Sequence, residues 1–262
     1  PEEKSRLFCA KWVREKHMAG KVFTPREMID RLVAFATTSR ESNLALIHFV
    51  RDYLAEHEIA ATLIHDQPGK QANLFATVGP IVDGGVVLSG HTDVVPVDGQ
   101  NWSADPFEVV VREGKLFGRG TADMKSFCAI GLALVPDMVR RKLALPIHFA
   151  LSYDEEVGCL GAPDLSRHLQ GLPVQPQALI VGEPTEMKVV NAHKGCCAIR
   201  TIVTGLEGHS SETHKGVNSI FAAAKLISYL ADKAEALQTS NVNPRFDPPY
   251  TCLLYTSDAA AE

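Results

Sequence analysis

The chain has 262 residues, an apolar fraction of 45% and a formal net charge of -5, which is enough chain to bury a sizeable core in one large domain or two small ones. This charge leaves no basic excess for binding nucleic acid or an anionic membrane, so we expect a small molecule as the partner. The six cysteines lack CxxC spacing and no segment reaches the roughly 18 apolar residues of a membrane span, so we expect reduced thiols and a cytoplasmic location.

Two helices are predicted near the start of the chain. Thr24 offers an N-cap hydroxyl, Pro25 fits the first helical position, and Glu27 completes a capping box, which predicts a helix through about residue 35. Apolar residues then recur at helical spacing and predict a second helix over about residues 44–58.

Strand-like apolar runs follow at residues 73–78, 85–89, 147–153 and 178–181, with a mostly apolar helix predicted over residues 126–141. Strands that alternate with helices favour an α/β fold whose mostly parallel sheet is covered by helices on both faces. The pattern changes after Gly195. Residues 198–204 alternate like a strand, residues 205–216 form a polar loop, and residues 217–237 have helical spacing, which predicts a second, smaller α+β domain.

Groups of imidazole and carboxylate side chains occur at regular steps of 32, 32 and 28 residues along these runs. They are His91 with Asp93, Asp123, the pair beginning at Glu155, and Glu183. Strand ends that meet in one crevice are where open α/β sheets build active sites, and histidine with carboxylates suits zinc or a similar divalent ion. The pattern therefore predicts a metal site and a metallohydrolase.

Each group taken alone also has a plain structural explanation. If the strand continues, His91 and Asp93 point to the same face and one can orient the other, but an ordinary strand-end histidine and a capping aspartate fit equally well. Asp123, after a glycine-rich turn, could be an N-cap, and Glu183 could be a turn acid. Four loops would rarely all supply ligand-type groups by chance, so their joint occurrence favours the metal site.

Three consecutive acids, Asp154, Glu155 and Glu156, follow one apolar run. Their mutual repulsion calls for a compensating cation if all three face one site. A solvated acidic loop is the alternative.

Five motifs follow one another along the chain: SGHTDVVP at residues 89–96, GRGTADMK at 118–125, SYDEEVG at 152–158, GEPT at 182–185 and GHSS at 208–211. Through them the chain resembles the M20 family of co-catalytic zinc amidohydrolases, over about residues 24–250. GCLG at residues 158–161 and AHKG at 192–195 resemble the acetylornithine deacetylase subgroup. The resemblance implies a zinc-peptidase-like catalytic domain and a ferredoxin-like lid and dimerisation domain.

The resemblance also implies a ligand set for two Zn²⁺ ions, for which Co²⁺ can substitute. His91, Asp123 and Glu183 would hold one zinc, Asp123 would bridge, and Glu156 would hold the second. Asp93 would orient His91 as a hydrogen-bond partner.

The catalytic roles implied by the resemblance fall on two further residues. Glu155 would be the general base that takes a proton from water and passes it to the departing amine. His209, in the second domain, would help to stabilise the oxyanion and would reach across a homodimer. Without the resemblance, His209 is more simply explained as a loop histidine.

The implied reaction is hydrolysis of the amide of an N-acyl amino acid, with N2-acetyl-L-ornithine giving L-ornithine and acetate in arginine biosynthesis as the expected case. Succinyl-diaminopimelate desuccinylase, aminoacylase and dipeptidase specificities remain alternatives. A noncatalytic metal-binding protein is another, although the presence of both Glu155 and His209 speaks against it.

Some features depart from the family pattern. Ser126 stands where relatives usually have glycine, and no histidine follows His214, whereas relatives supply a later one to the second zinc. We expect an extraneous extension over residues 1–23, a catalytic metal-binding domain over 24–194, a partial lid domain over 195–250 and a foreign, vector-like tail over 251–262. A fragment of this kind is expected to have low activity.

Overall fold

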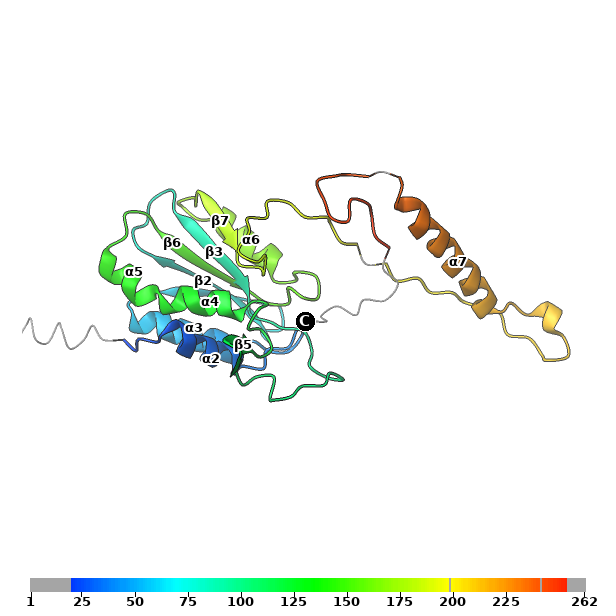
Figure 1. Ribbon diagram of the computed structural model, residues 1–262, viewed down its shortest axis with the longest axis horizontal. Coiled ribbons are helices and arrows are strands. Elements are labelled where there is room, and N and C mark those ends of the chain that lie inside the picture. The colour runs from blue at the N-terminus through cyan, green and yellow to red at the C-terminus, as the bar shows by residue number, and fades with distance from the viewer. Residues whose placement is uncertain (1–19, 198, 241, 254–262) are drawn as a thin grey trace, which may run out of the picture. The chain divides into compact units, whose positions relative to one another are not determined.

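The computed structural model describes residues 20–197, 199–240 and 242–253 (Figure 1). The chain divides into two compact units, Pro1–Met187 and Lys188–Glu262. The domain boundary expected at residue 194 stays a prediction. None of the helices in the described ranges is long and apolar enough to cross a membrane.

A five-stranded sheet with the strand order β1-β2-β6-β3-β7 forms the centre of the first unit. β3 pairs in parallel with both β6 and β7, whereas β2 is antiparallel to β1 and β6. Four of the five strands therefore point the same way, which confirms the mostly parallel sheet. The strand bounds are β1 (Ala61–His65), β2 (Ala72–Val78), β3 (Val86–His91), β6 (Ile147–Ser152) and β7 (Ala178–Val181).

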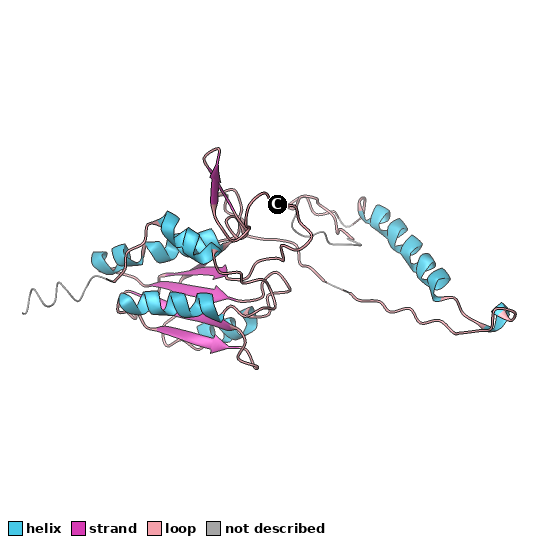
Figure 2. Cartoon of the chain, turned by 90° about the horizontal axis from the view of Figure 1, so that it is seen from below, coloured by secondary structure: helices cyan, strands magenta, loops and turns pink. Residues whose placement is uncertain are grey.

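Helices cover both faces of this sheet, as predicted (Figures 1 and 2). One face packs on α3 (Leu44–Glu56), α4 (Lys125–Ala133) and α5 (Val135–Arg141), α2 (Pro25–Val33) packs on α4, and together they form the main core. The other face packs on α6 (Ala162–Gln170), where Leu165 meets Phe75, Val87 and Ala150. Because side chains alternate along a strand, neighbouring residues of β2, β3 and β6 pack into the cores on opposite faces of the sheet.

The capping box predicted for the first helix is present. The Glu27 amide donates to Thr24 Oγ1 over 3.2 Å, and Glu27 Oε2 accepts from the Thr24 amide over 2.8 Å. Phe23, just before the cap, is buried and its ring lies 5.7 Å from that of Tyr53. The packed domain thus begins before Thr24, because Phe23 belongs to its core. Most of the extension expected over residues 1–23 falls on residues 1–19, which lie outside the described ranges.

The single helix predicted over residues 126–141 is two helices, α4 and α5, separated at Leu134. Pro136 lies in the first turn of α5. A proline has no amide hydrogen and its ring clashes with the carbonyl four residues earlier, so a continuous helix cannot pass through it undisturbed.

Several elements of the first unit were not predicted. They are β1, α6 and a separate hairpin of β4 (Val110–Arg112) and β5 (Lys115–Phe117). The apolar strand β7 is half exposed, with Leu179 at 49% and Ile180 at 50%, because it pairs with β3 along one side and lies at the end of the strand order.

The second unit contains the predicted long helix, α7 (Ser219–Leu237), capped by Asn218, whose Oδ1 accepts from the Ile220 amide. A short 3₁₀ helix, η1 (Thr213–Lys215), precedes it. The strand predicted over residues 198–204 is absent from residues 199–204, and residue 198 lies outside the described ranges. A strand needs a partner for its backbone hydrogen bonds, and the described part of this unit offers only an isolated bridge between Leu206 and Val217. The ferredoxin-like lid stays a prediction.

Asn43 ties the start of α3 to the sheet. Its buried side chain donates to the backbone oxygen of Ala72 and to Thr92 Oγ1, and accepts from the Ala72 amide. We expect Asn43→Ala to lower the free energy of unfolding by about 2–4 kcal/mol, because buried backbone groups lose their partners. Urea denaturation measures this, with the exposed Asn101→Ala as control. Equal stability of the two variants would contradict the assignment.

His148 on β6 provides a pH test of the α6 side of the sheet. Its ring stacks on Phe75 with centroids 5.5 Å apart, and burial lowers its pKa from the ordinary value of 6.5. In the unfolded chain this imidazole binds a proton near pH 6.5, whereas in the folded chain it stays neutral to a lower pH. His148 therefore makes the free energy of unfolding fall as the pH drops through and below that value. We expect His148→Gln to reduce the loss of unfolding free energy between about pH 7.5 and 5.5. The exposed His65→Gln should keep the wild-type loss, and a wild-type loss in His148→Gln would refute the expectation.

Candidate metal centre

His91 is the last residue of β3 and is 1% exposed. Its Nδ1 lies 2.9 Å from the backbone oxygen of Asp93, a pairing that favours the proton on Nδ1 and leaves Nε2 to face the carboxylates. A side chain at Gly90 could not be accommodated, because its Cβ would lie 2.6 Å from the Sγ of Cys128 on α4. Glycine at this position therefore lets the end of β3 approach α4 closely.

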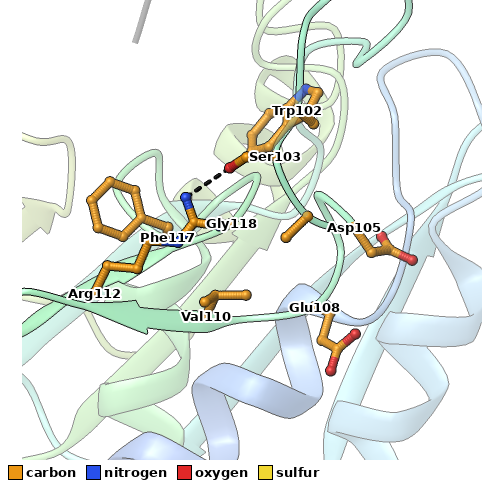
Figure 3. Close-up of a pocket in the computed structure, with 9 residues that line it drawn as sticks. Trp102, Ser103, Asp105, Glu108, Val110, Arg112, Phe117 and Gly118 are labelled. Atoms are coloured by element: carbon orange, nitrogen blue, oxygen red, sulfur yellow. Dashed lines mark hydrogen bonds between the residues drawn. The ribbon is translucent and has the colours of Figure 1, made fainter.

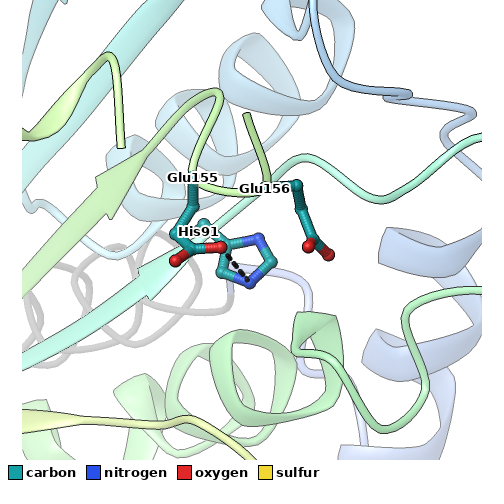
Figure 4. A group of neighbouring side chains, drawn as sticks. All are labelled: His91, Glu155 and Glu156. Carbon is teal, nitrogen blue, oxygen red and sulfur yellow. Dashed lines mark ion pairs between the residues drawn. The ribbon is translucent and has the colours of Figure 1, made fainter. Parts of the chain in front are cut away.

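Three carboxylates surround the Nε2 atom of His91. Asp123 Oδ1 lies 3.0 Å away, Glu183 Oε1 3.8 Å and Glu155 Oε2 3.9 Å. Two groups of potential ligands have atoms within 4.8 Å of one another: His91 with Asp123 and Glu183, and His91 with Glu155 and Glu156. Figure 4 shows the carboxylates of the second group beside the imidazole ring.

The sheet explains why these residues meet. Glu183 follows β7 and Glu155 follows β6, and both strands run parallel to β3, which ends at His91. The carboxyl ends of parallel strands lie at one edge, so residues far apart in the sequence converge there.

Asp123 reaches the site from the glycine-rich turn that the sequence indicated. It lies in the turn before α4 and not at the end of a strand of the main sheet, because the preceding strand, β5, belongs to the separate hairpin. The first ligand set expected from the sequence is nevertheless assembled, whereas Glu156 is grouped with Glu155 and His91.

Asp93 is a buried hydrogen-bond acceptor behind the site. Its carboxylate accepts from Ser39 Oγ over 2.7 Å and from the amides of Glu155 and Glu156 over 3.0 and 3.3 Å. Its Oδ1 lies 3.5 Å from His91 Nδ1. Burial raises the pKa of Asp93, but the hydrogen bonds with His91, Ser39 and the Glu155 amide outweigh burial and hold the pKa below its usual range.

Asp154 does not join the other two acids at the site. It is 3% exposed, with φ of 51°, and its Oδ1 accepts from the Arg40 amide over 2.6 Å and from Gln71 Nε2 over 2.9 Å. The expectation of three repelling acids is therefore wrong for Asp154, since a long-range contact turns it away.

The remaining acids shift one another's protonation. The pKa of Glu156 is raised to about 7, by burial first and then by the charge of Asp123, and the pKa of Glu183 is also raised, again chiefly by burial. Burial lowers the pKa of His91, but hydrogen bonds to Asp123 and Asp93 outweigh burial and raise it to about 11. The cluster thus favours positive charge at its centre, which a divalent cation with imidazole and carboxylate ligands would supply.

The protein side of the site is closed and the other side is open. The His91 side chain is 1% exposed, whereas those of Asp123, Glu155 and Glu183 are 37%, 36% and 38% exposed. The carboxylates can therefore meet a ligand from solvent while their imidazole partner stays fixed.

Cys159 is a neighbour of the site that the site prediction did not include. Its Sγ lies 3.6 Å from Glu155 Oε1, and burial and the charge of Glu155 raise the pKa of its thiol. The GCLG segment contained this residue, but no local pattern indicated which carboxylate the thiol would contact.

His209 belongs to the second unit, where it is exposed and its Nδ1 lies 2.7 Å from Ser211 Oγ. Its predicted part in catalysis stays a proposal.

A small cavity of about 60 Å³ lies between the loop before β4 and the β4–β5 hairpin (Figure 3). Arg112 donates to Ser103 Oγ across it, over 2.7 Å. It contains none of the predicted site residues and has room for only a few water molecules. The His91 cluster is therefore the candidate functional site.

Comparison with known proteins agrees with this site. The model of the Peptidase family M20/M25/M40 matches residues 87–260. Acetylornithine deacetylase of Proteus mirabilis (strain HI4320) is 37% identical over 214 residues, which cover 80% of this chain and 54% of the relative. The enzyme of that name from Pasteurella multocida (strain Pm70) is 34% identical over 231 residues, or 86% of this chain and 59% of the relative. The chain spans about half the length of the curated relatives it matches.

A solved structure shares the fold. The M20 family metallo-carboxypeptidase Sso-CP2 from Sulfolobus solfataricus aligns with a TM-score of 0.53 at 16% identity, over 62% of this chain and 37% of that one. The resemblance inferred from the five motifs is thereby confirmed at the level of family and fold. The match over residues 87–260 and the identity to curated relatives show that the chain belongs to the peptidase family M20/M25/M40.

Proposed function

We propose that this protein is a metal-dependent amidohydrolase that cleaves N2-acetyl-L-ornithine to L-ornithine and acetate, as a step of arginine biosynthesis. The observation that carries the proposal is the buried His91 ring with three carboxylates within 3.9 Å of its Nε2 atom. The similarity to acetylornithine deacetylases supports the choice of acyl amino acid.

The proposed metal ligands are those that the sequence predicted. His91, Asp123 and Glu183 would hold one Zn²⁺, and Glu156 with a bridging Asp123 would contribute to the second; Co²⁺ has a similar ligand preference and could replace zinc. When bound, such cations polarise the acyl carbonyl and lower the pKa of water.

Glu155 is the proposed general base. Its carboxylate is 36% exposed, while its backbone amide is held by the Asp93 carboxylate, so the side chain can meet substrate from a fixed position. It would take a proton from the attacking water as the new C–O bond forms, and return that proton to the amine nitrogen as the C–N bond breaks. This use of one carboxylate for proton transfer is why Glu155 and Glu156 would have different roles.

The second unit would complete the enzyme. We assign to His209 a role in stabilising the oxyanion of the tetrahedral intermediate, and to this unit a homodimer contact. Both assignments rest on the GHSS motif and the family membership.

Metal binding can be tested without turnover. Titration of the purified chain with Zn²⁺ or Co²⁺ should show binding by calorimetry and, for Co²⁺, by its visible absorption. We expect His91→Ala to weaken the affinity by at least about 100-fold, because it removes the imidazole ligand of the first proposed metal ion, whereas the exposed His65→Ala should bind like the wild type. Equal affinities in the two variants would exclude His91 as a ligand.

Substrate choice and the general base are tested together by kinetics. In a panel of N-acetyl, N-succinyl and dipeptide substrates, N2-acetyl-L-ornithine should have the highest kcat/KM. Glu155→Gln should lower kcat about 10²–10⁴-fold while metal affinity stays close to wild type, because the amide cannot accept the proton. Glu113→Gln, an exposed glutamate in the turn between β4 and β5, is the control. A different preferred substrate would replace the ornithine assignment, and full activity of Glu155→Gln would remove the base assignment.

A further inference from the structure

We propose that Ser39, which lies outside all the motifs of the sequence, is a positioning residue for the metal centre. Its hydroxyl fixes the carboxylate of Asp93, to which the backbone of Glu155 and Glu156 is attached by hydrogen bonds. The inference rests on the proposed function and adds to it a residue that acts through Asp93.

The segment that carries Ser39 is aligned with the end of β3. Thr38 forms a parallel bridge with Val94, the Ser39 amide donates to the Val94 oxygen over 3.0 Å, and the Val94 amide donates to the Thr37 oxygen over 3.0 Å. These backbone contacts place the Ser39 side chain against Asp93, where it is 8% exposed. Its Oγ then donates to Asp93 Oδ2 over 2.7 Å.

The Asp93 carboxylate is costly to bury unless its oxygens are hydrogen-bonded, because its side chain is only 2% exposed. Among the described residues, the donors to this carboxylate apart from His91 are the Ser39 hydroxyl and the two amides of the residues proposed as base and metal ligand. The Ser39 hydroxyl thus fixes the orientation of the Asp93 carboxylate, and this carboxylate in turn fixes the amides of Glu155 and Glu156. Removal of the hydroxyl would let the carboxylate rotate and loosen both amides.

A second contact from the same segment supports this. The amide of Arg40, next in the chain, donates to the buried Asp154 carboxylate over 2.6 Å, and Gln71 donates to the same oxygen and to the Glu41 backbone. The connection between α2 and α3 therefore holds the loop of residues 154–156 at two points. Partners of this kind set the spacing between metal ligands, and their loss typically lowers metal affinity about 10–100-fold.

The experiment compares Ser39→Ala with Ser39→Thr and with Ser126→Ala. Ser126 is the matched control, because within the described ranges its buried hydroxyl has no hydrogen-bond partner. Amide hydrogen exchange of Glu155 and Glu156 is followed by NMR in the metal-free chain, and Zn²⁺ and Co²⁺ affinities are measured by titration. We expect Ser39→Ala to speed exchange at both amides and to weaken metal binding about 10–100-fold, Ser39→Thr to restore both, and Ser126→Ala to match the wild type.

Unchanged exchange at Glu155 and Glu156 in Ser39→Ala, or metal affinity equal to that of Ser126→Ala, would overturn the proposal. If Ser39→Ala does not fold, Ser39→Cys decides: its weaker donor should give intermediate exchange and affinity, and wild-type values would overturn the proposal. If the wild-type chain binds neither metal, the proposed function fails, and the positioning of the loop by Ser39 is then judged from the exchange rates alone.

Discussion

The hydrogen-bonded carboxylate of Asp93 is the interaction on which the metal centre depends. It joins three parts of the chain that are remote in sequence: the end of β3, the connection between α2 and α3 through Ser39, and the loop that carries Glu155 and Glu156. A buried charge is tolerated only where donors surround it, so these contacts must form together. The same acid therefore stabilises the fold locally and sets the position of the proposed base.

The direction of the strands supplies the rest of the site. Since β3, β6 and β7 are neighbours and parallel, His91, Glu155 and Glu183 emerge at one edge of the sheet, and the turn before α4 adds Asp123. Burial first, and then the charge of Asp123, raises the pKa of Glu156, an arrangement that a cation would stabilise. Burial of His91 among partly exposed carboxylates gives the site a fixed imidazole and a face that is open to solvent.

Contacts between distant parts of the chain determined the structure at two places where the sequence pattern was misleading. Asp154 looked like a third acid of the site, but the Arg40 amide, 114 residues away in the chain, turns it aside. Residues 199–204 alternate like a strand yet form none, because strand formation needs hydrogen-bonding partners that the described part of the second unit lacks. The single helix predicted over residues 126–141 was wrong for a local reason, because Pro136 interrupts it.

The sequence by itself determined the features that depend on neighbours along the chain. The capping box of α2, the apolar runs of β2, β3, β6 and β7, the helix α7 and the identity of the ligand-type residues all follow from local spacing. Only the tertiary structure decided that Asp123 Oδ1 lies 3.0 Å from His91 Nε2, that the Arg40 amide donates to Asp154, and that Ser39 contacts Asp93 across 54 residues of sequence. Those contacts arise from packing between distant segments, and a hydrogen bond between such segments leaves no periodic signal in the chain.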